Sequence, residues 1–207
     1  ADVFVTVERN EADYGVVPVE NSTEGAVTTT HDRFVDTPLK VCAEIYLPVS
    51  NCLLANGPRD QIKRVYSHPQ VIGQCRQWLQ REMAGVEVIP APSTAKAAEW
   101  AAKEPGASAL AARLAAEVYG LKVIAADIQD LSGNKTRFMV LGRSIGPRSG
   151  ADKTSLVFSV QHKVGALFNA LVSFKKFKLN MTRIESRPSR NKAWEYYFFV
   201  DIEGHVE

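Results

Sequence analysis

The sequence predicts an α/β fold followed by a second, smaller domain, and three observations support this expectation. Through the first 142 residues short apolar runs alternate with helical patterns, which favours helices packed on the faces of a largely parallel sheet. Residues 143–152 are rich in Gly, Pro and Ser and lack apolar periodicity, as expected of a linker. Residues 153–207 then follow a strand-helix-strand-strand order, the first part of a ferredoxin-like unit.

Each expected element has a local signature. Val3, Phe4 and Val7 lie on one face of a helical pattern, and residues 14–19 form a short apolar strand. Pro48 interrupts a β-rich run over residues 39–55, which therefore forms two strands or one bent strand. Gly120 ends an alanine-rich helix over residues 111–119. The other expected strands cover residues 63–67, 86–89, 107–109, 121–126, 136–141, 153–161, 179–187 and 194–201. One further helix ends near residue 35, and the others cover residues 69–83, 93–103 and 165–177.

The composition excludes several classes of function. The chain is 45% hydrophobic and 23% charged, which is ordinary for a globular protein. A net charge of +2 is too small for a nucleic-acid surface, and no apolar stretch approaches the roughly 20 residues of a membrane helix. Cys42, Cys52 and Cys75 are widely spaced and odd in number, which favours free thiols over a disulfide framework or a zinc site. We therefore expect a cytoplasmic protein that binds neither nucleic acid nor membrane.

Three strand-to-helix junctions carry polar residues of the same kinds. The segments PVENST, YSHPQ and APSTA place Asn21, Ser67, His68, Ser93 and Thr94 where apolar strands end. In open α/β sheets ligands collect at the carboxyl ends of strands, and helix N-termini favour anions. Each junction alone is better explained by helix capping. Together with the segment Thr136-Arg137-Phe138, the three junctions favour a site for a small polycarboxylate.

Two motifs place a hydroxyl beside a guanidinium at the polar end of a strand. Thr136-Arg137-Phe138 opens one strand, and Glu185-Ser186-Arg187-Pro188 closes another. A hydroxyl at such a boundary can donate or relay a proton, and Arg can bind a carboxylate through two parallel hydrogen bonds. Structural explanations stay open for both motifs, because Thr is common in strands, Arg137 can pair with a surface acid, and the second motif can be a bulge or turn.

His68 and Glu20 are the titratable groups nearest to the junctions. His68 either titrates within the site or fixes its turn through a hydrogen bond. Glu20 either orients its neighbours and shares a proton or is a solvated charge in a first helical turn. The remaining histidines are surrounded by ordinary polar residues, and their spacing does not indicate a metal site: His31, His162 and His205.

In this order, the motifs resemble the prephenate dehydratase family, in which a catalytic domain precedes an ACT regulatory domain. The resemblance covers residues 12–22, 66–70, 74–75, 93–94, 107–120 and 134–138, and then residues 165–167, 180–182, 184–188 and 194–196. It implies a catalytic domain of two α/β lobes with a cleft between them, like type II periplasmic binding proteins, over residues 1–142. It also implies a ferredoxin-like (βαββαβ) ACT domain over residues 153–207. The family converts prephenate to phenylpyruvate, with loss of carbon dioxide and water, in phenylalanine synthesis.

The resemblance also implies a role for each candidate residue, without a metal or organic cofactor. The threonine of the TRF motif is the main catalytic group of the family and corresponds to Thr136. The residues implied in catalysis are Thr136, Asn21, Ser67, Gln74 and Glu20. Those implied in binding prephenate are Ser22, His68, Ser93, Thr94, Arg137 and Phe138. Those implied in binding L-phenylalanine, within a homodimer or homotetramer that this ligand inhibits, are Gly165, Ala166, Leu167, Asn180, Glu185, Ser186, Arg187 and Pro188.

Three departures from the family pattern accompany the resemblance. The glycine-rich segment that belongs early in the catalytic domain and the closing helix and strand of the ACT domain are absent, and Phe168 stands where the family often has Val. We therefore expect an internal piece of a longer polypeptide, with or without a chorismate mutase domain upstream. Two other functions stay open, which are the same reaction on arogenate and non-catalytic sensing of an amino acid.

Overall fold

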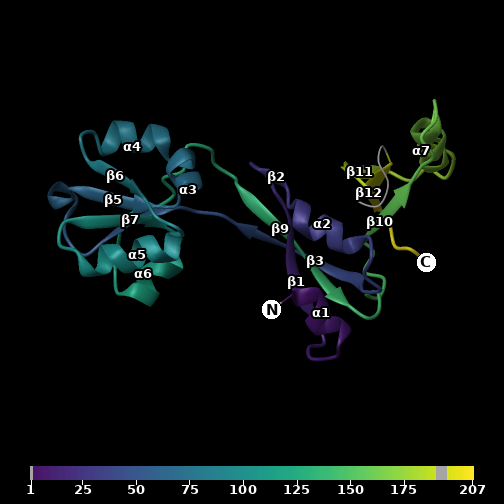
Figure 1. Cartoon of the computed structure of the whole chain (residues 1–207), viewed down its shortest axis with the longest axis horizontal. Coiled ribbons are helices and arrows are strands. Elements are labelled where there is room, and N and C mark those ends of the chain that lie inside the picture. Colours follow the sequence, from purple (N-terminus) through teal and green to yellow (C-terminus); the bar gives the residue numbers. More distant parts are fainter. Residues whose placement is uncertain (1, 190–194) are drawn as a thin grey trace. The chain divides into compact units, whose positions relative to one another are not determined.

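The computed structural model describes residues 2–189 and 195–207 and divides the chain into two compact units. The first unit comprises Ala1–Leu47 and Thr136–Glu207, and the second comprises Pro48–Lys135 (Figure 1). The chain leaves the first unit after Leu47 and returns at Thr136, so this unit is built from two separate stretches of sequence. The predicted linker, residues 143–152, lies within the first unit, and the domain division at this linker stays a prediction.

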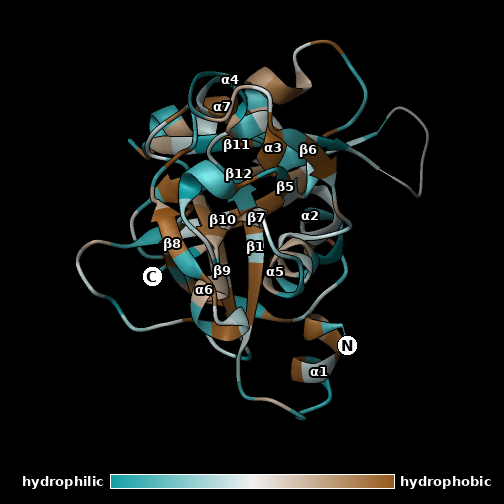
Figure 2. Ribbon diagram, turned by 90° about the vertical axis from the view of Figure 1, so that its left-hand side faces the viewer, coloured by the Kyte–Doolittle hydropathy of each residue, from teal (hydrophilic) through white to brown (hydrophobic). Residues whose placement is uncertain are grey.

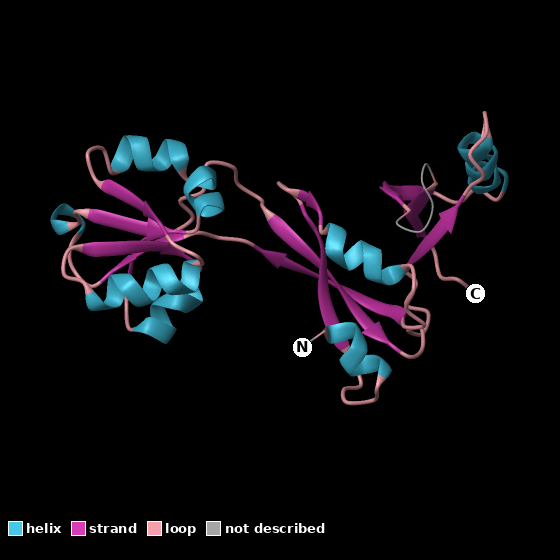
Figure 3. Ribbon diagram, in the orientation of Figure 1, coloured by secondary structure: helices cyan, strands magenta, loops and turns pink. Residues whose placement is uncertain are grey.

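The second unit is a five-stranded sheet with helices on both faces (Figure 3). The strand order is β6-β5-β7-β4-β8, and β5 runs parallel to both β6 and β7. The strand by which the chain enters, β4, lies between β7 and β8 and runs antiparallel to both. The expected largely parallel sheet is therefore wrong, and the sheet is mixed. The strands are β4 (Cys52–Ala55), β5 (Arg64–Ser67), β6 (Glu87–Pro90), β7 (Ala107–Ala111) and β8 (Lys122–Ala125), with a 3₁₀ turn at Arg59–Gln61.

Alternate residues of these strands pack in two separate cores, as the two-residue period of a strand requires. Leu53 and Leu110 face α3 (Pro69–Gln74) and α4 (Arg76–Glu82). Leu54 and Ala109 face α5 (Thr94–Lys103) and α6 (Arg113–Tyr119). Because both faces are covered, these strands read as continuous apolar runs in the sequence. In Figure 2 the brown of hydrophobic residues follows strands such as β8 and β1.

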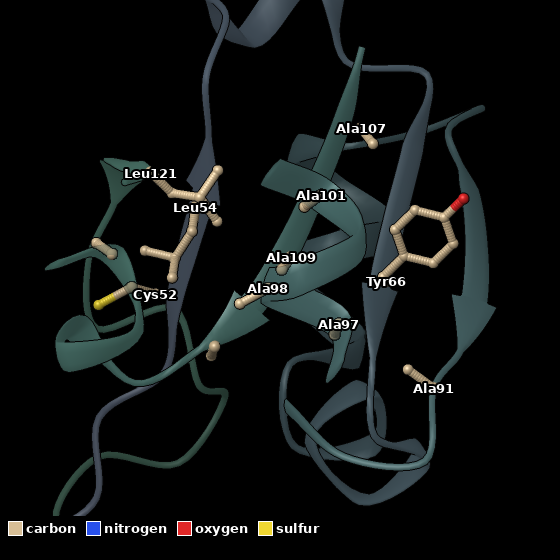
Figure 4. Close-up of a cluster of buried hydrophobic side chains, with 12 residues drawn as sticks. Cys52, Leu54, Tyr66, Ala91, Ala97, Ala98, Ala101, Ala107, Ala109 and Leu121 are labelled. Carbon is tan, nitrogen blue, oxygen red and sulfur yellow. The ribbon is translucent and has the colours of Figure 1, made fainter. Parts of the chain in front are cut away.

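Small side chains let α5 approach the sheet closely. Ala97, Ala98 and Ala101 of α5 are almost completely buried against Ala107 and Ala109 of β7 (Figure 4). A methyl group fills little space, so the helix backbone lies close to the strand and dispersion contacts are dense. The alanine-rich composition of this region is therefore a packing requirement.

The predicted helix over residues 69–83 is two helices. The backbone breaks at Cys75, where φ is −112°, and α4 begins at the next residue. The carboxylate of Asp130 accepts hydrogen bonds from the backbone N–H groups of Gln77 (2.9 Å) and Trp78 (3.0 Å), which satisfies the first turn of α4. A partner that is distant in sequence therefore sets the start of this helix.

Within residues 2–189 and 195–207, none of the helices is long and apolar enough to cross a membrane.

The first unit begins with a four-stranded sheet of order β2-β1-β9-β3. Its strands are β1 (Gly15–Asn21), β2 (Gly25–Ala26), β3 (Lys40–Pro48) and β9 (Lys135–Gly142). Two short helices, α1 (Val3–Glu8) and α2 (Thr28–Phe34), pack on one face of this sheet. The core between them contains Phe4, Val7, Val17, Val19, Leu39, Met139 and Leu141.

A three-stranded antiparallel sheet completes the first unit. Its elements are β10 (Lys153–Ser159), α7 (Ala166–Lys176), β11 (Met181–Pro188) and β12 (Tyr196–Glu203), and the strand order is β10-β12-β11. The expected strand-helix-strand-strand order is confirmed, although the expected start of the last strand at residue 194 lies outside the described residues. Phe174 of α7 packs against Phe158, which stacks on Phe198, so the helix covers one face of the sheet.

A substitution at the α5 interface tests this close packing. We expect Ala98→Leu to lower the free energy of unfolding by about 1–3 kcal/mol, because extra methylenes must displace backbone or neighbouring side chains. Ala95→Leu is the matched control, since Ala95 is exposed on the same helix and Leu and Ala have similar helix propensities. Denaturant unfolding of the variants measures the difference. Equal stability of the two variants would contradict close packing at Ala98.

Candidate active site

Two polar side chains that are 115 residues apart in sequence meet across a strand pair. Asn21 of β1 lies directly opposite Thr136 of β9, and its Nδ2 donates a hydrogen bond of 3.0 Å to the Thr136 Oγ1. The Asn21 Oδ1 accepts from the backbone N–H groups of Thr23 (3.0 Å) and Glu24 (3.2 Å), which fixes the orientation of the amide. Because the Thr136 oxygen accepts from Asn21, the hydrogen of the same hydroxyl can be donated elsewhere.

The neighbouring cross-strand pair, Glu20 and Arg137, points to the opposite face of the sheet. Side chains alternate along a strand, so Arg137 shares a face with the buried Met139 and not with Thr136. The pairing shifts between Pro18 and Glu20, and this irregularity places Glu20 opposite Arg137. A neutral hydroxyl-amide pair therefore lies on one face and a charged pair on the other.

Arg137 is buried in an ion-pair network. Its Nε lies 2.7 Å from a Glu44 carboxylate oxygen, and its Nη1 donates to Asp201 of β12. Lys153 binds the other Glu44 oxygen at 2.7 Å. Burial opposes the charge of Arg137, but Asp201 and Glu44 raise its pKa above the ordinary value. The Arg137 guanidinium is thus paired on the face opposite Thr136, and its role in binding substrate stays a prediction.

Glu20 is also held in an ion pair, and its role in catalysis stays a prediction. Its carboxylate lies 3.0 Å from the Nε of Arg183 in β11 and shares the face of Arg137. It is therefore an ion-pair partner behind the Asn21–Thr136 pair. Of the other predicted residues in this region, Phe138 lies on the face of Thr136 and is partly buried, and Ser22 is exposed after β1.

In the second unit the predicted residues gather at one edge of the sheet. Strands β5 and β6 are parallel and Ser67 is paired with Pro90, so the segments that follow them begin at the same edge. His68 Nδ1 accepts from the backbone N–H of Gln70 at 3.3 Å, and Ser93 Oγ accepts from that of Lys96 at 3.0 Å. Thr94 begins α5 beside Ser93. His68 and Ser93 thus make the contacts expected of residues that only cap a helix or fix a turn. Both of them and Thr94 also lie at one edge of the sheet.

The side chains of two further predicted residues of this unit are held by hydrogen bonds. Ser67 is completely buried, and its hydroxyl donates to the Leu110 carbonyl at 2.8 Å. Gln74 Oε1 accepts from the Nδ2 of Asn51 at 3.1 Å, and Asn51 is itself buried. Both contacts fix the backbone around the polar edge, and the catalytic roles of Ser67 and Gln74 stay predictions.

The residues expected to bind phenylalanine divide between the two faces of the C-terminal sheet. Gly165, with a φ of +78°, starts α7, and Ala166 and Leu167 line a hollow of about 160 Å³. Ser186 belongs to this side, because it is paired with Phe198, which also lines the hollow. The positive φ requires a left-handed backbone that Gly adopts easily. Pro188 shares the face of Ser186, and Asn180 is exposed before β11.

Glu185 and Arg187 lie on the opposite face of β11. The Nη2 of Arg187 is 3.0 Å from a carboxylate oxygen of Asp32 in α2, and Glu185 lies 3.8 Å from Arg183. The guanidinium of Arg187 pairs with Asp32, and its role in binding the regulatory ligand stays a prediction. The alternation of strand side chains separates it from Ser186.

His31 is a buried titratable group that sequence reasoning set aside. Its Nδ1 lies 2.9 Å from the Val27 carbonyl, which can only accept, so Nδ1 carries the proton. Its Nε2 lies 3.2 Å from Arg183 Nη1 and accepts from it. Burial, together with Arg183 and Arg187, lowers the pKa of His31, against the opposing effects of the Val27 carbonyl and Glu185. The imidazole is therefore neutral at physiological pH.

Several charged partners were also missed from the sequence: Glu44, Asp201, Arg183 and Asp32. Asp201 had a visible signal, because a carboxylate inside the apolar run FFVDIE needs a buried partner. Glu44, Arg183 and Asp32 stand in ordinary polar surroundings, and only the tertiary contacts distinguish them.

The thiols and acids do not form a metal site within the described ranges. Residues 2–189 and 195–207 contain no group of three or more His, Cys, Asp or Glu side chains that could hold an ion. Burial raises the pKa of the Cys75 thiol to about 12, so it stays protonated at neutral pH. A protonated, buried thiol is a poor nucleophile and a poor metal ligand.

Comparison with known proteins places these features in a family. Residues 1–145 match the sequence model of prephenate dehydratase. A bifunctional chorismate mutase/prephenate dehydratase from Aquifex aeolicus (strain VF5) is 47% identical over 100% of this chain and 57% of that protein. The crystal structure of a prephenate dehydratase in complex with L-Phe from Arthrobacter aurescens is 34% identical with a TM-score of 0.86, covering 98% of this chain and 69% of that one. GqqA, described as a novel type of quorum quenching acylase, is 28% identical with a TM-score of 0.84, covering 99% and 76%.

The fold and the candidate site define a mixed α/β protein with polar groups held at strand ends. The family match covers more than half of the chain, and the chain belongs to the prephenate dehydratase family. It spans 57% of the length of the Aquifex relative.

The neutral state of His31 predicts a pH-dependent stability. Because its folded pKa lies below 6.5, the unfolded chain takes up a proton at His31 before the folded chain does as the pH falls. The contribution of His31 to the free energy of unfolding is therefore complete at pH values above 6.5 and is lost progressively as the pH falls below 6.5. We expect the thermal midpoint to fall more steeply between about pH 7.5 and about pH 5.5 in the unmodified protein than in His31→Gln, which cannot titrate. His162→Gln, at an exposed position, should keep the steep slope, and equal slopes in all three proteins would refute the assignment.

Proposed function

We propose that this chain forms part of a prephenate dehydratase, which converts prephenate to phenylpyruvate, carbon dioxide and water. The observation that carries the proposal is the hydrogen-bonded Asn21–Thr136 pair in a chain of this family. The relatives that the chain matches bear this activity in their names.

The reaction needs little covalent help from the protein. The bond between the ring and its carboxylate breaks, its electron pair enters the ring, and the C–O bond to the ring hydroxyl breaks at the opposite carbon. The ring becomes aromatic, the carboxylate leaves as carbon dioxide, and the leaving hydroxyl takes up one proton and departs as water. The protein therefore has to deliver this proton and hold the substrate.

Thr136 is suited to deliver the proton. Asn21 occupies a lone pair of the Thr136 oxygen at 3.0 Å, so the hydroxyl hydrogen points away from Asn21 and can be donated to a leaving group. As this proton moves, negative charge develops on the Thr136 oxygen, and the Asn21 N–H stabilises it. The oxygen then regains a proton from solvent.

We also propose that the polar edge of the second unit, taken by itself, recognises carboxylates. His68, Ser93 and Thr94 lie where β5 and β6 end, and their hydroxyl and imidazole groups suit carboxylates such as those of prephenate. Ser67 and Gln74 support this edge through their bonds to Leu110 and Asn51. The buried Arg137 is left out of this assignment.

We further propose that β10, α7, β11 and β12 belong to an ACT domain that binds L-phenylalanine. Their order and the hollow at the start of α7 support this proposal, and so does the L-Phe complex of the Arthrobacter relative. The side chain of Phe168 is 69% exposed on α7, and apolar surface of this kind suits a homodimer or homotetramer.

Replacing Thr136 tests the catalytic proposal. We expect Thr136→Ala in the full-length protein to lower the kcat for prephenate by about 10²–10⁴-fold, the usual contribution of a general acid. Thr136→Ser keeps the hydroxyl and should retain measurable turnover. Thr29→Ala, at an exposed position of α2, is the control and should match the unmodified protein. Phenylpyruvate formation measures turnover, and unchanged kcat in Thr136→Ala would remove this residue from the mechanism.

The same assay separates the alternative functions. If the unmodified full-length protein turns over arogenate and leaves prephenate unchanged, the substrate assignment is wrong while the chemistry stands. Turnover of neither substrate, with phenylalanine still bound, would favour a non-catalytic sensor.

A variant at the hollow tests the regulatory proposal. Ser186 faces the side of the hollow, so we expect Ser186→Ala to raise the phenylalanine concentration for half inhibition about tenfold, which corresponds to about 1.4 kcal/mol. The kcat without phenylalanine should not change. Ser173→Ala on the exposed side of α7 is the control. An inhibition curve that is identical in the two variants would count against the assigned ligand site.

A further inference from the structure

Four charged residues, here called the charge quartet, join the two sheets of the first unit. Glu20 lies opposite Arg137 on β1 and β9, and Arg183 lies opposite Asp201 on β11 and β12. Each cross-strand pair contains one acid and one arginine, and the acid of each pair faces the arginine of the other. Glu20 therefore meets Arg183 at 3.0 Å, and Arg137 meets Asp201.

Three members of the quartet are mostly buried. The side chains of Asp201, Arg137 and Arg183 are 4%, 8% and 12% exposed, and that of Glu20 is 35% exposed. Asp201 also accepts a hydrogen bond of 2.6 Å from Ser155, and Arg183 donates to His31. Removing Asp201 would leave the buried Arg137 with Glu44 as its remaining acidic partner, so the arrangement of the guanidinium would be less restrained.

The quartet lies next to the candidate catalytic pair. Glu20 precedes Asn21 and Arg137 follows Thr136, so the two cross-strand pairs are adjacent rungs of one ladder. Fixing the backbone at one rung limits the movement of the next. The hydrogen bond between Asn21 and Thr136 is partly exposed and joins neutral groups, so it restrains its own geometry less strongly than an ion pair with buried members does.

We propose that Arg183 and Asp201 are positioning residues, which hold the Asn21–Thr136 pair in its productive register through Glu20 and Arg137. The inference rests on the proposed function where it concerns turnover. It assigns a role in catalysis to a sheet that contributes no group to the proposed chemistry. A purely structural ion pair would contribute to stability and leave the geometry at Thr136 unchanged in the folded protein.

The test compares Asp201→Asn with Glu203→Gln in the full-length protein. Both remove one negative charge from β12, but Glu203 is exposed and Asp201 is buried against Arg137. We expect Asp201→Asn to lower kcat for prephenate about 10–100-fold, as small misplacements of catalytic groups do. Its KM should change less than about twofold, and Glu203→Gln should match the unmodified protein. An unchanged kcat in folded Asp201→Asn would overturn the proposal.

Hydrogen exchange gives a second measurement that does not depend on activity. In Asp201→Asn we expect faster exchange of the backbone amides of β1 and β9 around Asn21 and Thr136, while the amides of β5 and β7 stay protected. If the unmodified protein does not turn over prephenate, the proposed function fails and this measurement still decides the role of the quartet. Exchange that is equal to that of Glu203→Gln would overturn it.

If Asp201→Asn does not fold, Ser155→Ala provides a second test of the proposal. This change keeps all four charges and removes only the 2.6 Å hydrogen bond to Asp201. We expect kcat to fall about threefold to tenfold, with the same increase in exchange at β1 and β9, because Asp201 loses one of its restraints. Ser159→Ala, at an exposed position of the same strand, is the control. Equal kcat and equal exchange in the two serine variants would overturn the proposal.

Discussion

The pairing of β1 with β9 is the constraint on which the first unit depends. It joins two stretches of sequence between which the whole second unit is inserted. The same ladder carries the core residues Val17 and Met139, then Glu20 with Arg137, and finally Asn21 with Thr136. Packing, ion pairing and the candidate chemistry therefore occupy successive rungs of one strand pair, and a slip in register would move all of them to the wrong face.

The two faces of this ladder carry different polar interactions, a neutral hydrogen bond on one face and ion pairs on the other. On one face a neutral amide orients a neutral hydroxyl, which suits a group that must give up a proton and regain it. On the other face charged side chains are buried and must be paired, because an isolated buried charge is very costly. An unpaired Arg137 on the face of Thr136 would attract substrate carboxylates but would also compete for the Asn21 oxygen. The alternation of strand side chains avoids this conflict.

Much of the secondary structure could be predicted from apolar periodicity, including the break at Pro48 and the helix end at Gly120, whose φ is +68°. Strand direction could not, since periodicity does not reveal whether β4 runs with β7 or against it. For the site, the polar segments were visible but their partners were not. Arg137 and Asp201 are 64 residues apart, and the irregular pairing near Val19 has no local signature. The two-residue strand period does separate Thr136 from Arg137, and applying it to the TRF motif would have predicted their opposite faces.

Strand β12 links the two roles that we propose for the C-terminal sheet. Phe198 lines the hollow at the start of α7, and Asp201, three residues further along, faces the other side and contacts Arg137. Because both residues belong to one short strand, a ligand that displaced β12 from the hollow would also act on the quartet. Coupling between two sites requires that the ligand favours one arrangement over another. In our proposal, β12 is the short connection from the hollow to the rung beside Thr136.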